Sequence, residues 1–159
     1  TPLDTGSMLM IAEFDPVHPE RLISEPKCLS RPLYGFENTE HTINNEGPYA
    51  FYYHNKIYLA YSGGDARGYL YAIGMLTAND GDDLCDLSVW EKAKTPIASF
   101  ATIPGEYGPG HNSFFWDRDQ NLWIAYHAVT SFEEKIVSSG MRRVYFEQDK
   151  TPRVDVIVE

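Results

Sequence analysis

Two segments of this chain repeat one strand-turn-strand pattern at a spacing of 65 residues. The first pattern covers residues 51–61 and the second covers residues 114–126. Their second strands, IYLAY at residues 57–61 and LWIAY at residues 122–126, superpose without a gap. A repeat of this length, made of short strands with aromatic ends, is typical of sheets arranged radially in a β-propeller.

Glycine and proline precede the first strand of each repeat, next to a side chain that can titrate. The sequence is EGP at residues 46–48 in the first repeat and GPGH at residues 108–111 in the second. The segments that lead into the first strands of the blades are where a propeller builds its central site. We therefore expect Glu46 and His111 to lie near the axis.

Length limits how much of a propeller this chain can form. The 159 residues, with a mass of 18.1 kDa, are enough for one domain with a substantial core. A closed ring needs at least about four blades, whereas 159 residues hold fewer than two and a half units of 65 residues. The chain is therefore expected to form roughly half of a ring.

No helical pattern of useful length occurs, so the sequence predicts an all-β fold, a partial propeller of four-stranded antiparallel blades. The whole chain, 1–159, is expected to be one partial propeller domain. Residues 1–45 would form the end of a preceding blade and a long connection, 46–106 one blade, and 107–159 a second blade. The expected strands cover residues 8–14, 49–53, 56–62, 69–76, 90–99, 112–116, 122–128, 142–147 and 153–158.

The net charge of −10 argues against two classes of partner, nucleic acid and anionic membrane surfaces, because both attract clustered lysine and arginine. The apolar runs are also too short to cross a bilayer. A neutral, hydroxyl-rich ligand suits this balance, since 14% of the residues are aromatic and can stack on it. The start of the chain has no signal-peptide pattern, so localisation is open, with the cytoplasm slightly favoured.

Two other sequence patterns do not indicate a disulfide or a metal site. Cys28 and Cys85 fit neither a disulfide frame nor a metal motif, and we expect buried or idle thiols. The acidic turn at residues 79–83 is not a calcium loop, because placing Gly81 at the sixth position puts Leu76 where an oxygen ligand is needed. A solvated turn is expected there.

Four stretches together resemble glycoside hydrolase family 43. They are NEGP at residues 45–48, YLAYS at 58–62, YGPGHNSF at 107–114 and WIAYHA at 123–128. The resemblance runs in order from about residue 40 to 128 and is nearest to α-L-arabinofuranosidases and β-xylosidases. It implies a five-bladed propeller of about twice this length, of which this chain corresponds to the C-terminal half.

The resemblance also implies an inverting hydrolysis that uses three acids. These are a base Asp, an Asp that tunes the acid, and a general acid Glu in the Glu-Gly-Pro motif. Only the last has a match, Glu46, so both aspartates would come from outside this chain. His111 matches a histidine near the ring axis that some members associate with calcium or its water shell. The resemblance therefore implies no required cofactor, and it allows a structural Ca²⁺ near His111.

Further substrate contacts are expected around this site. Arg142 or Arg143 is the candidate for an arginine that often touches the sugar in the family. Tyr107 and Trp116 are candidates for stacking on a sugar ring. Taken without the resemblance, Glu46 would more often be a solvated loop glutamate and His111 a hydrogen-bonded structural histidine.

Two hypotheses of different class follow. In the first, the chain is the acid-bearing part of a glycosidase acting on arabinose- or xylose-containing glycans. Inversion needs two carboxylates about 6.5–9.5 Å apart, so a missing N-terminal half, a second polypeptide or a second copy must supply the base. In the second, the chain is a non-catalytic carbohydrate-binding or structural half-propeller that self-associates.

Overall fold

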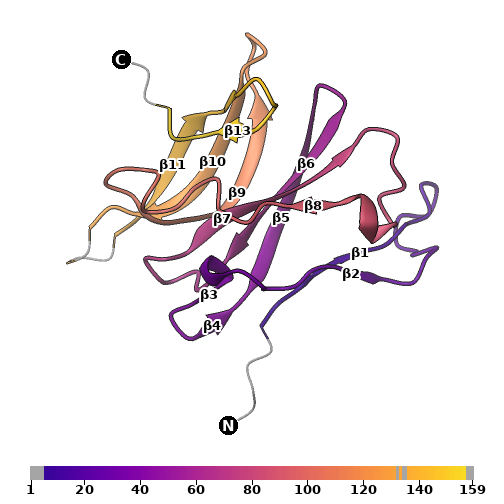
Figure 1. Ribbon diagram of the computed structural model, residues 1–159, viewed down its shortest axis with the longest axis horizontal. Coiled ribbons are helices and arrows are strands. Elements are labelled where there is room, and N and C mark those ends of the chain that lie inside the picture. Colours follow the sequence, from indigo (N-terminus) through magenta and orange to yellow (C-terminus); the bar gives the residue numbers. More distant parts are fainter. Residues whose placement is uncertain (1–5, 132, 134–135, 157–159) are drawn as a thin grey trace.

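The computed structural model describes residues 6–131, 133 and 136–156, and this part of the chain is built almost entirely from strands (Figure 1). The predicted all-β class is therefore confirmed. Within the described ranges no helix is long and apolar enough to span a bilayer. The elements are β1 (Leu9–Ile11), β2 (Lys27–Ser30), η1 (Gly35–Glu37), β3 (Asn38–Thr39), β4 (Thr42–Ile43), β5 (Asn45–Tyr53), β6 (Lys56–Gly63), β7 (Ala72–Asn79), η2 (Leu87–Val89), β8 (Glu91–Lys92), β9 (Tyr107–Trp116), β10 (Leu122–Val129), β11 (Val137–Arg143), β12 (Tyr145–Phe146) and β13 (Pro152–Arg153).

The first large sheet has four antiparallel strands in the order β5-β6-β7-β8. Its hairpin turns at His54 and Asn55, whose φ angles of 46° and 62° suit the tight turn that a right-twisted hairpin favours. The third strand begins three residues later than expected, at Ala72. The expected fourth strand over residues 90–99 is wrong in extent, because regular pairing covers only β8 and a bridge from Ile73 to Ala98. Pro96 lies in between and has no amide hydrogen for a ladder.

The second large sheet has three strands in the order β11-β10-β9. Its third strand was expected at residues 142–147 and instead is β11, which ends at Arg143. Val144 leaves this ladder and donates its amide to the carbonyl of Leu122 at 2.8 Å. β12 and β13 then pair with each other as a separate sheet, so the expected fourth strand over 153–158 is also wrong. Residues 157 and 158 of that expectation lie outside the described residues.

Residues 15–45, expected as a long connection, contain short paired strands. β2 pairs with β1, and β3 pairs with β4. Phe36 of this segment and Leu9 of β1 pack with Tyr61 and Leu76 of the first sheet in a small apolar cluster. The segment therefore covers the face of the first sheet that points away from the second.

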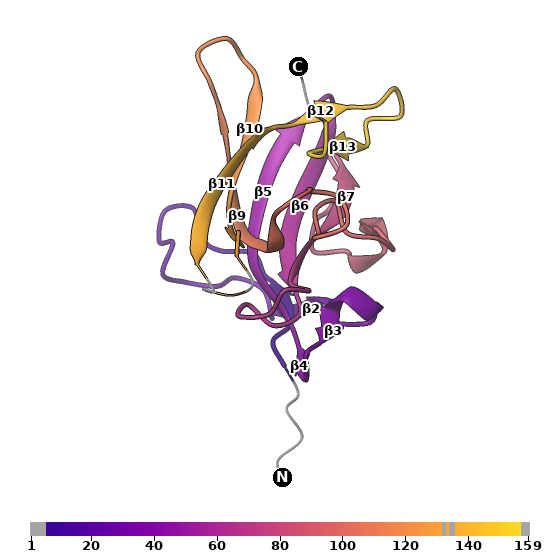
Figure 2. The same ribbon diagram turned by 90° about the vertical axis from the view of Figure 1, so that its left-hand side faces the viewer.

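The main core fills the space between the two large sheets, which lie side by side with β9 next to β5 (Figures 1 and 2). The strands β5 and β9 run parallel, as two contacts along them show. A Cβ at Gly47 would lie 3.3 Å from Nδ1 of His111, and the rings of Phe51 and Phe114 are 4.5 Å apart between centroids. The strand starts that carry Glu46 and His111 therefore meet at one end of the molecule.

Candidate active site

Glu46 is the second residue of β5, at an irregularity in the strand. Pairing with β6 shifts register between Glu46 and Tyr49, where Gly47 has a φ of 57° and Pro48 can donate no hydrogen bond. The half-buried Glu46 carboxyl accepts a hydrogen bond of 2.7 Å at Oε1 from the hydroxyl of Tyr71. The Gly-Pro pair thus frees this side chain from the regular alternation of the sheet.

Tyr71, which the sequence interpretation missed, is the main partner of Glu46. Its side chain is 0% exposed and comes from the residue just before β7. A Cβ at Gly110 would lie 1.9 Å from the Tyr71 ring, so glycine is required there for β9 to pass. Burial, together with the nearby Glu46, raises the pKa of Tyr71 far above its usual 10.0. The hydroxyl therefore stays protonated and acts as a donor to Glu46.

Two histidines complete the cluster. The His111 amide donates to Oγ of Ser62 at 2.8 Å, and a φ of 51° turns the chain here after the Gly-Pro-Gly segment. His127 of β10 stacks on Tyr71 with 5.5 Å between ring centroids and lies 6.5 Å from the His111 ring. Burial and the positive charge that His111 can carry lower the pKa of His127, which favours a neutral imidazole. Glu46, Tyr71, His111 and His127 therefore gather at one place.

A cavity of about 400 Å³ opens beside Glu46. Asp65 supplies a second carboxyl group to its lining, and that group accepts a hydrogen bond from the amide of Arg67 at 2.9 Å. No motif in the sequence pointed to Asp65 or to Tyr71, because each reaches the Glu46 region only when the strands β5, β6 and β7 pair in the first sheet. The full lining is Gly6, Ser7, Thr42, Ile43, Asn44, Glu46, Asp65 and Ala66.

The two candidate arginines occupy other environments. The Arg142 guanidinium forms an ion pair with Glu106 at 3.0 Å and donates from Nε to the Tyr126 hydroxyl at 2.9 Å. Arg143 lies over the ring of Tyr145. No contact described in the structure joins either arginine to Glu46, so their role in sugar binding stays a prediction.

The two candidate stacking residues lie at opposite ends of β9. Tyr107 is its first residue and meets Tyr69 edge-on, with 6.1 Å between ring centroids. Trp116 is its last residue and packs on Tyr53 at the end of β5 away from Glu46. The structure therefore brings Tyr107 to the Glu46 end and leaves Trp116 at the other.

The surroundings of His111 do not fit direct calcium binding. Calcium takes about six to eight oxygen ligands, whereas the His111 ring offers nitrogen and has Gly47 and His127 as neighbours. Among the described residues, the group of side chains placed to share an ion is Glu13, Asp83 and Cys85, without His111. A calcium ion held beside His111 through water stays a prediction.

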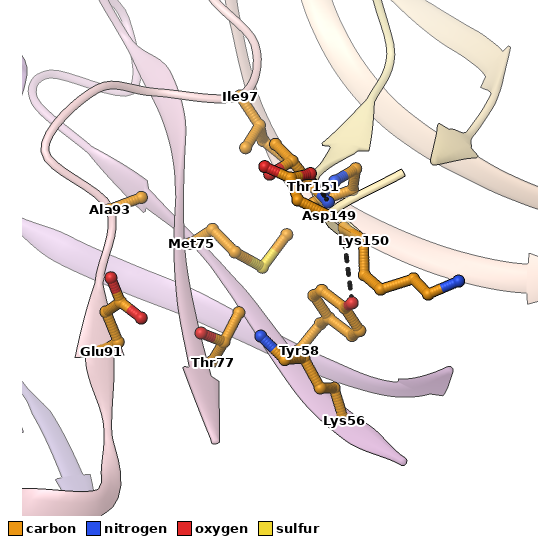
Figure 3. A pocket seen from close by; sticks show the side chains of 11 residues that line it. Lys56, Tyr58, Met75, Thr77, Glu91, Ala93, Ile97, Asp149, Lys150 and Thr151 are labelled. Atoms are coloured by element: carbon orange, nitrogen blue, oxygen red, sulfur yellow. Dashed lines mark hydrogen bonds between the residues drawn. The ribbon is translucent and has the colours of Figure 1, made fainter. Parts of the chain in front are cut away.

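A separate cavity of about 270 Å³ lies where the β12–β13 hairpin meets the first sheet (Figure 3). Met75 and Ile97 are among its lining residues, and the Tyr58 hydroxyl, also in the lining, donates to the carbonyl of Lys150 at 2.8 Å. None of the predicted site residues lines it. It is therefore not part of the site around Glu46.

The sequence profile of glycosyl hydrolases family 43 matches residues 5–152, and the chain belongs to this family. It is 28% identical to an extracellular exo-α-(1→5)-L-arabinofuranosidase of Streptomyces avermitilis, with 98% of this chain and 33% of the relative aligned. It is 34% identical to the enzyme of the same name from Streptomyces chartreusis, with 79% and 37% aligned. The crystal structure of an α-L-arabinofuranosidase from Lactobacillus brevis superposes with a TM-score of 0.80 at 29% identity.

The chain is shorter than these relatives, and one prediction from the sequence is wrong. The chain spans about a third of these curated relatives and covers 46% of the Lactobacillus brevis chain, against 92% of its own length. The slight preference for the cytoplasm is wrong, because both Streptomyces relatives are named extracellular enzymes. The prediction rested on the lack of a leader pattern at residue 1, which does not determine localisation.

Proposed function

We propose that this chain is the acid-bearing part of a glycoside hydrolase that cleaves arabinose- or xylose-containing glycans. The observation that carries the proposal is the hydrogen bond from the buried Tyr71 hydroxyl to Glu46, at the edge of an open cavity. The family and the arabinofuranosidase relatives support the reaction and the sugar class. In this proposal Glu46 is the general acid.

The geometry suggests how Glu46 would work. Its Oε1 accepts the Tyr71 hydrogen bond, which leaves Oε2 to carry a proton toward the glycosidic oxygen. As that bond breaks, the proton moves to the leaving oxygen and the carboxylate that remains keeps the Tyr71 donor. Water attacks the anomeric carbon from the opposite face and gives its proton to a base carboxylate about 6.5–9.5 Å away.

The base must come from outside this chain. Asp65 lines the same cavity as Glu46, but its carboxyl group accepts from its own turn and has no counterpart among the acids that the resemblance implies. We therefore assign the base, and the aspartate that tunes the acid, to another part of a longer protein, a second polypeptide or a second copy. A ring of five blades would bring the three acids together, with the described sheets as two of the blades.

A non-catalytic carbohydrate-binding role is the second candidate. Its supporting observation is that one matched carboxylate alone cannot invert a glycoside. The two candidates differ in what they require of Glu46, since a binding module needs no proton transfer. Kinetic measurements can distinguish the two candidates, provided that they use an assembly that contains all three acids.

The test compares Glu46→Gln with the wild type in that assembly, on an unactivated arabinoside and on an activated aryl arabinoside. General acid catalysis is worth about 10²–10⁴-fold, so turnover of the unactivated substrate should fall by that much. The aryl substrate needs little protonation and should lose far less. The control is Glu20→Gln, an exposed glutamate distant in sequence from the cluster. Equal losses on both substrates would argue against the acid role.

A further inference from the structure

A shallow groove of about 190 Å³ lies at the end of the molecule opposite Glu46. Tyr53 is six residues beyond Gly47 on β5, which at about 3.3 Å per residue puts the groove about 20 Å from the cluster. Trp116, whose expected sugar contact the Glu46 site does not provide, forms one wall. The lining is Tyr53, Trp116, Gln120, Asn121, Leu122, Arg143, Val144, Tyr145 and Phe146.

The aromatic wall is held in place and remains open to solvent. The Trp116 ring stacks on Tyr53, with 6.2 Å between centroids and 25° between planes, and Tyr53 stacks on Phe146 at 3.8 Å. Trp116 nevertheless keeps 42% of its surface exposed. Because the indole is already fixed, a ligand that binds to it costs little side-chain entropy. Its exposed apolar face can therefore hold a flat, partly apolar ligand.

Planar polar groups lie in the groove and beside it. Asp117 accepts hydrogen bonds from Nε1 of Trp123 at 2.7 Å and from Nδ2 of Asn121 at 3.0 Å, which lower its pKa to about 2. Arg143 donates to Oδ1 of Asn121 and covers Tyr145. Gln120 forms no side-chain hydrogen bond with any other described residue. The groove thus offers the Gln120 carboxamide and the Arg143 guanidinium as planar hydrogen-bonding groups, which suit a ligand rich in hydroxyl groups.

We propose that this groove is a second, non-catalytic binding site for a saccharide unit of a glycan chain. The apolar face of the sugar would pack on Trp116, and its hydroxyl groups would pair with Gln120 and the outer edge of Arg143. A site about 20 Å from Glu46 holds a polymer without blocking the cavity beside the acid. The choice of pentose-containing glycans as ligand rests on the proposed function, whereas the site itself does not.

The experiment is electrophoresis of the chain in native gels that contain linear arabinan or arabinoxylan, with a gel free of polysaccharide as reference. Wild type and Glu46→Gln should be retarded equally. Trp116→Ala should weaken the apparent binding about tenfold, the size of a lost aromatic contact. Gln120→Ala should weaken it less. Tyr52→Ala is the matched control, because Tyr52 is an exposed aromatic at the same end of β5 and does not line the groove.

Trp116→Phe keeps an aromatic face and should retain part of the binding, which separates loss of the platform from loss of folding. Retardation by either polysaccharide that depends on Trp116 supports the proposal, even if the assembly proves inactive. Retardation that Trp116→Ala leaves unchanged overturns it, and so does a wild type that neither polysaccharide retards. Loss of binding in Tyr52→Ala as strong as in Trp116→Ala also overturns it.

Discussion

Glu37 shows best how single residues hold the Glu46 end of the molecule. Its carboxyl group is 0% exposed and accepts from the amide of Leu33 at 2.6 Å and from the hydroxyl of Tyr61 at 2.7 Å. It also pairs with Lys92 at 2.5 Å and accepts from Nδ2 of Asn45 at 2.9 Å. Since Asn45 directly precedes Glu46, this network fixes the backbone that carries the acid. The sequence offered no sign of it, because its members are spread from residue 33 to residue 92.

Lys92→Met should strongly destabilise the chain. Removing one partner of a buried ion pair leaves the other charge without compensation, at a cost of about 3–5 kcal/mol. The free energy of unfolding in urea measures the effect. The double variant Glu37→Gln/Lys92→Met should recover part of the loss, because it leaves no isolated charge. A single variant within about 0.5 kcal/mol of wild type would contradict the structural role of the pair.

The same network predicts how stability depends on pH. Burial alone would raise the pKa of Glu37, but Lys92 and the hydrogen bonds outweigh it and hold the pKa below the usual 4.5. A depressed folded pKa gives stability that is fully present above pH 4.5 and is lost as the pH falls through the folded value. The wild type should therefore lose stability on acidification below pH 4.5, and the double variant should lose less over the same range. Identical slopes in urea titrations would count against this origin.

Tyr71→Phe tests the contact beside Glu46. The variant keeps the ring against His127 and removes the hydroxyl that Glu46 accepts from. We expect a stability loss of only about 1 kcal/mol, the usual net value of one hydrogen bond, with a much larger drop in turnover in the complete assembly. The control is Tyr58→Phe, which also removes a hydrogen-bonded hydroxyl but lies at the other cavity. If both variants lower turnover equally, Tyr71 has no special relation to the acid.

At the scale of elements, the sequence predicted the hairpins well and the third strands poorly. The β5–β6 and β9–β10 hairpins contain alternating apolar residues and polar turns, which identify strands locally. The third strands instead depend on a cross-strand fit: Tyr61 faces Gly74, and Tyr126 faces Gly140. A Cβ at either glycine would lie 2.4 Å from the facing tyrosine ring. Glycine normally weakens a strand, so the residue that makes this pairing possible also hid it from prediction.

Gly140→Ala should therefore be destabilising despite being a small change. The added methyl group meets the Tyr126 ring, and that ring cannot move freely because its hydroxyl is bonded to Glu106 and Arg142. Overpacking of this kind costs about 1–3 kcal/mol. Gly35→Ala is the matched control, since a Cβ there meets nothing within 4 Å. Thermal or urea unfolding distinguishes the two variants. Equal stabilities would show that the Tyr126 ring moves aside at little cost.

At the scale of the whole molecule, the two faces of the sheet pair differ in how they are covered. The outer face of the first sheet packs against residues of the N-terminal region, including Leu9 and Phe36. On the second sheet, Phe115, Val137 and Met141 are exposed. The repeat in the sequence indicated a partial ring from length alone, but it could not say which face would be left bare. Which face is left bare depends on whether the connecting segment folds back over a sheet. The segment 15–45 does fold back, over the first sheet.

The bare face leads to the last prediction, that the isolated chain associates with itself. Soluble monomers rarely expose contiguous apolar patches beyond a few hundred Å², and a second copy could cover this face by twofold symmetry. Met141, 61% exposed near the middle of β11, is the residue to change. Sedimentation at micromolar concentration should show a species heavier than 18.1 kDa, which Met141→Lys shifts toward the monomer. The control Met10→Lys alters a methionine of similar exposure on β1 and should leave the association unchanged. A wild-type chain that sediments as a clean monomer and binds no apolar dye would refute the half-ring interpretation, because a ring opened at this face must either bury it or expose it.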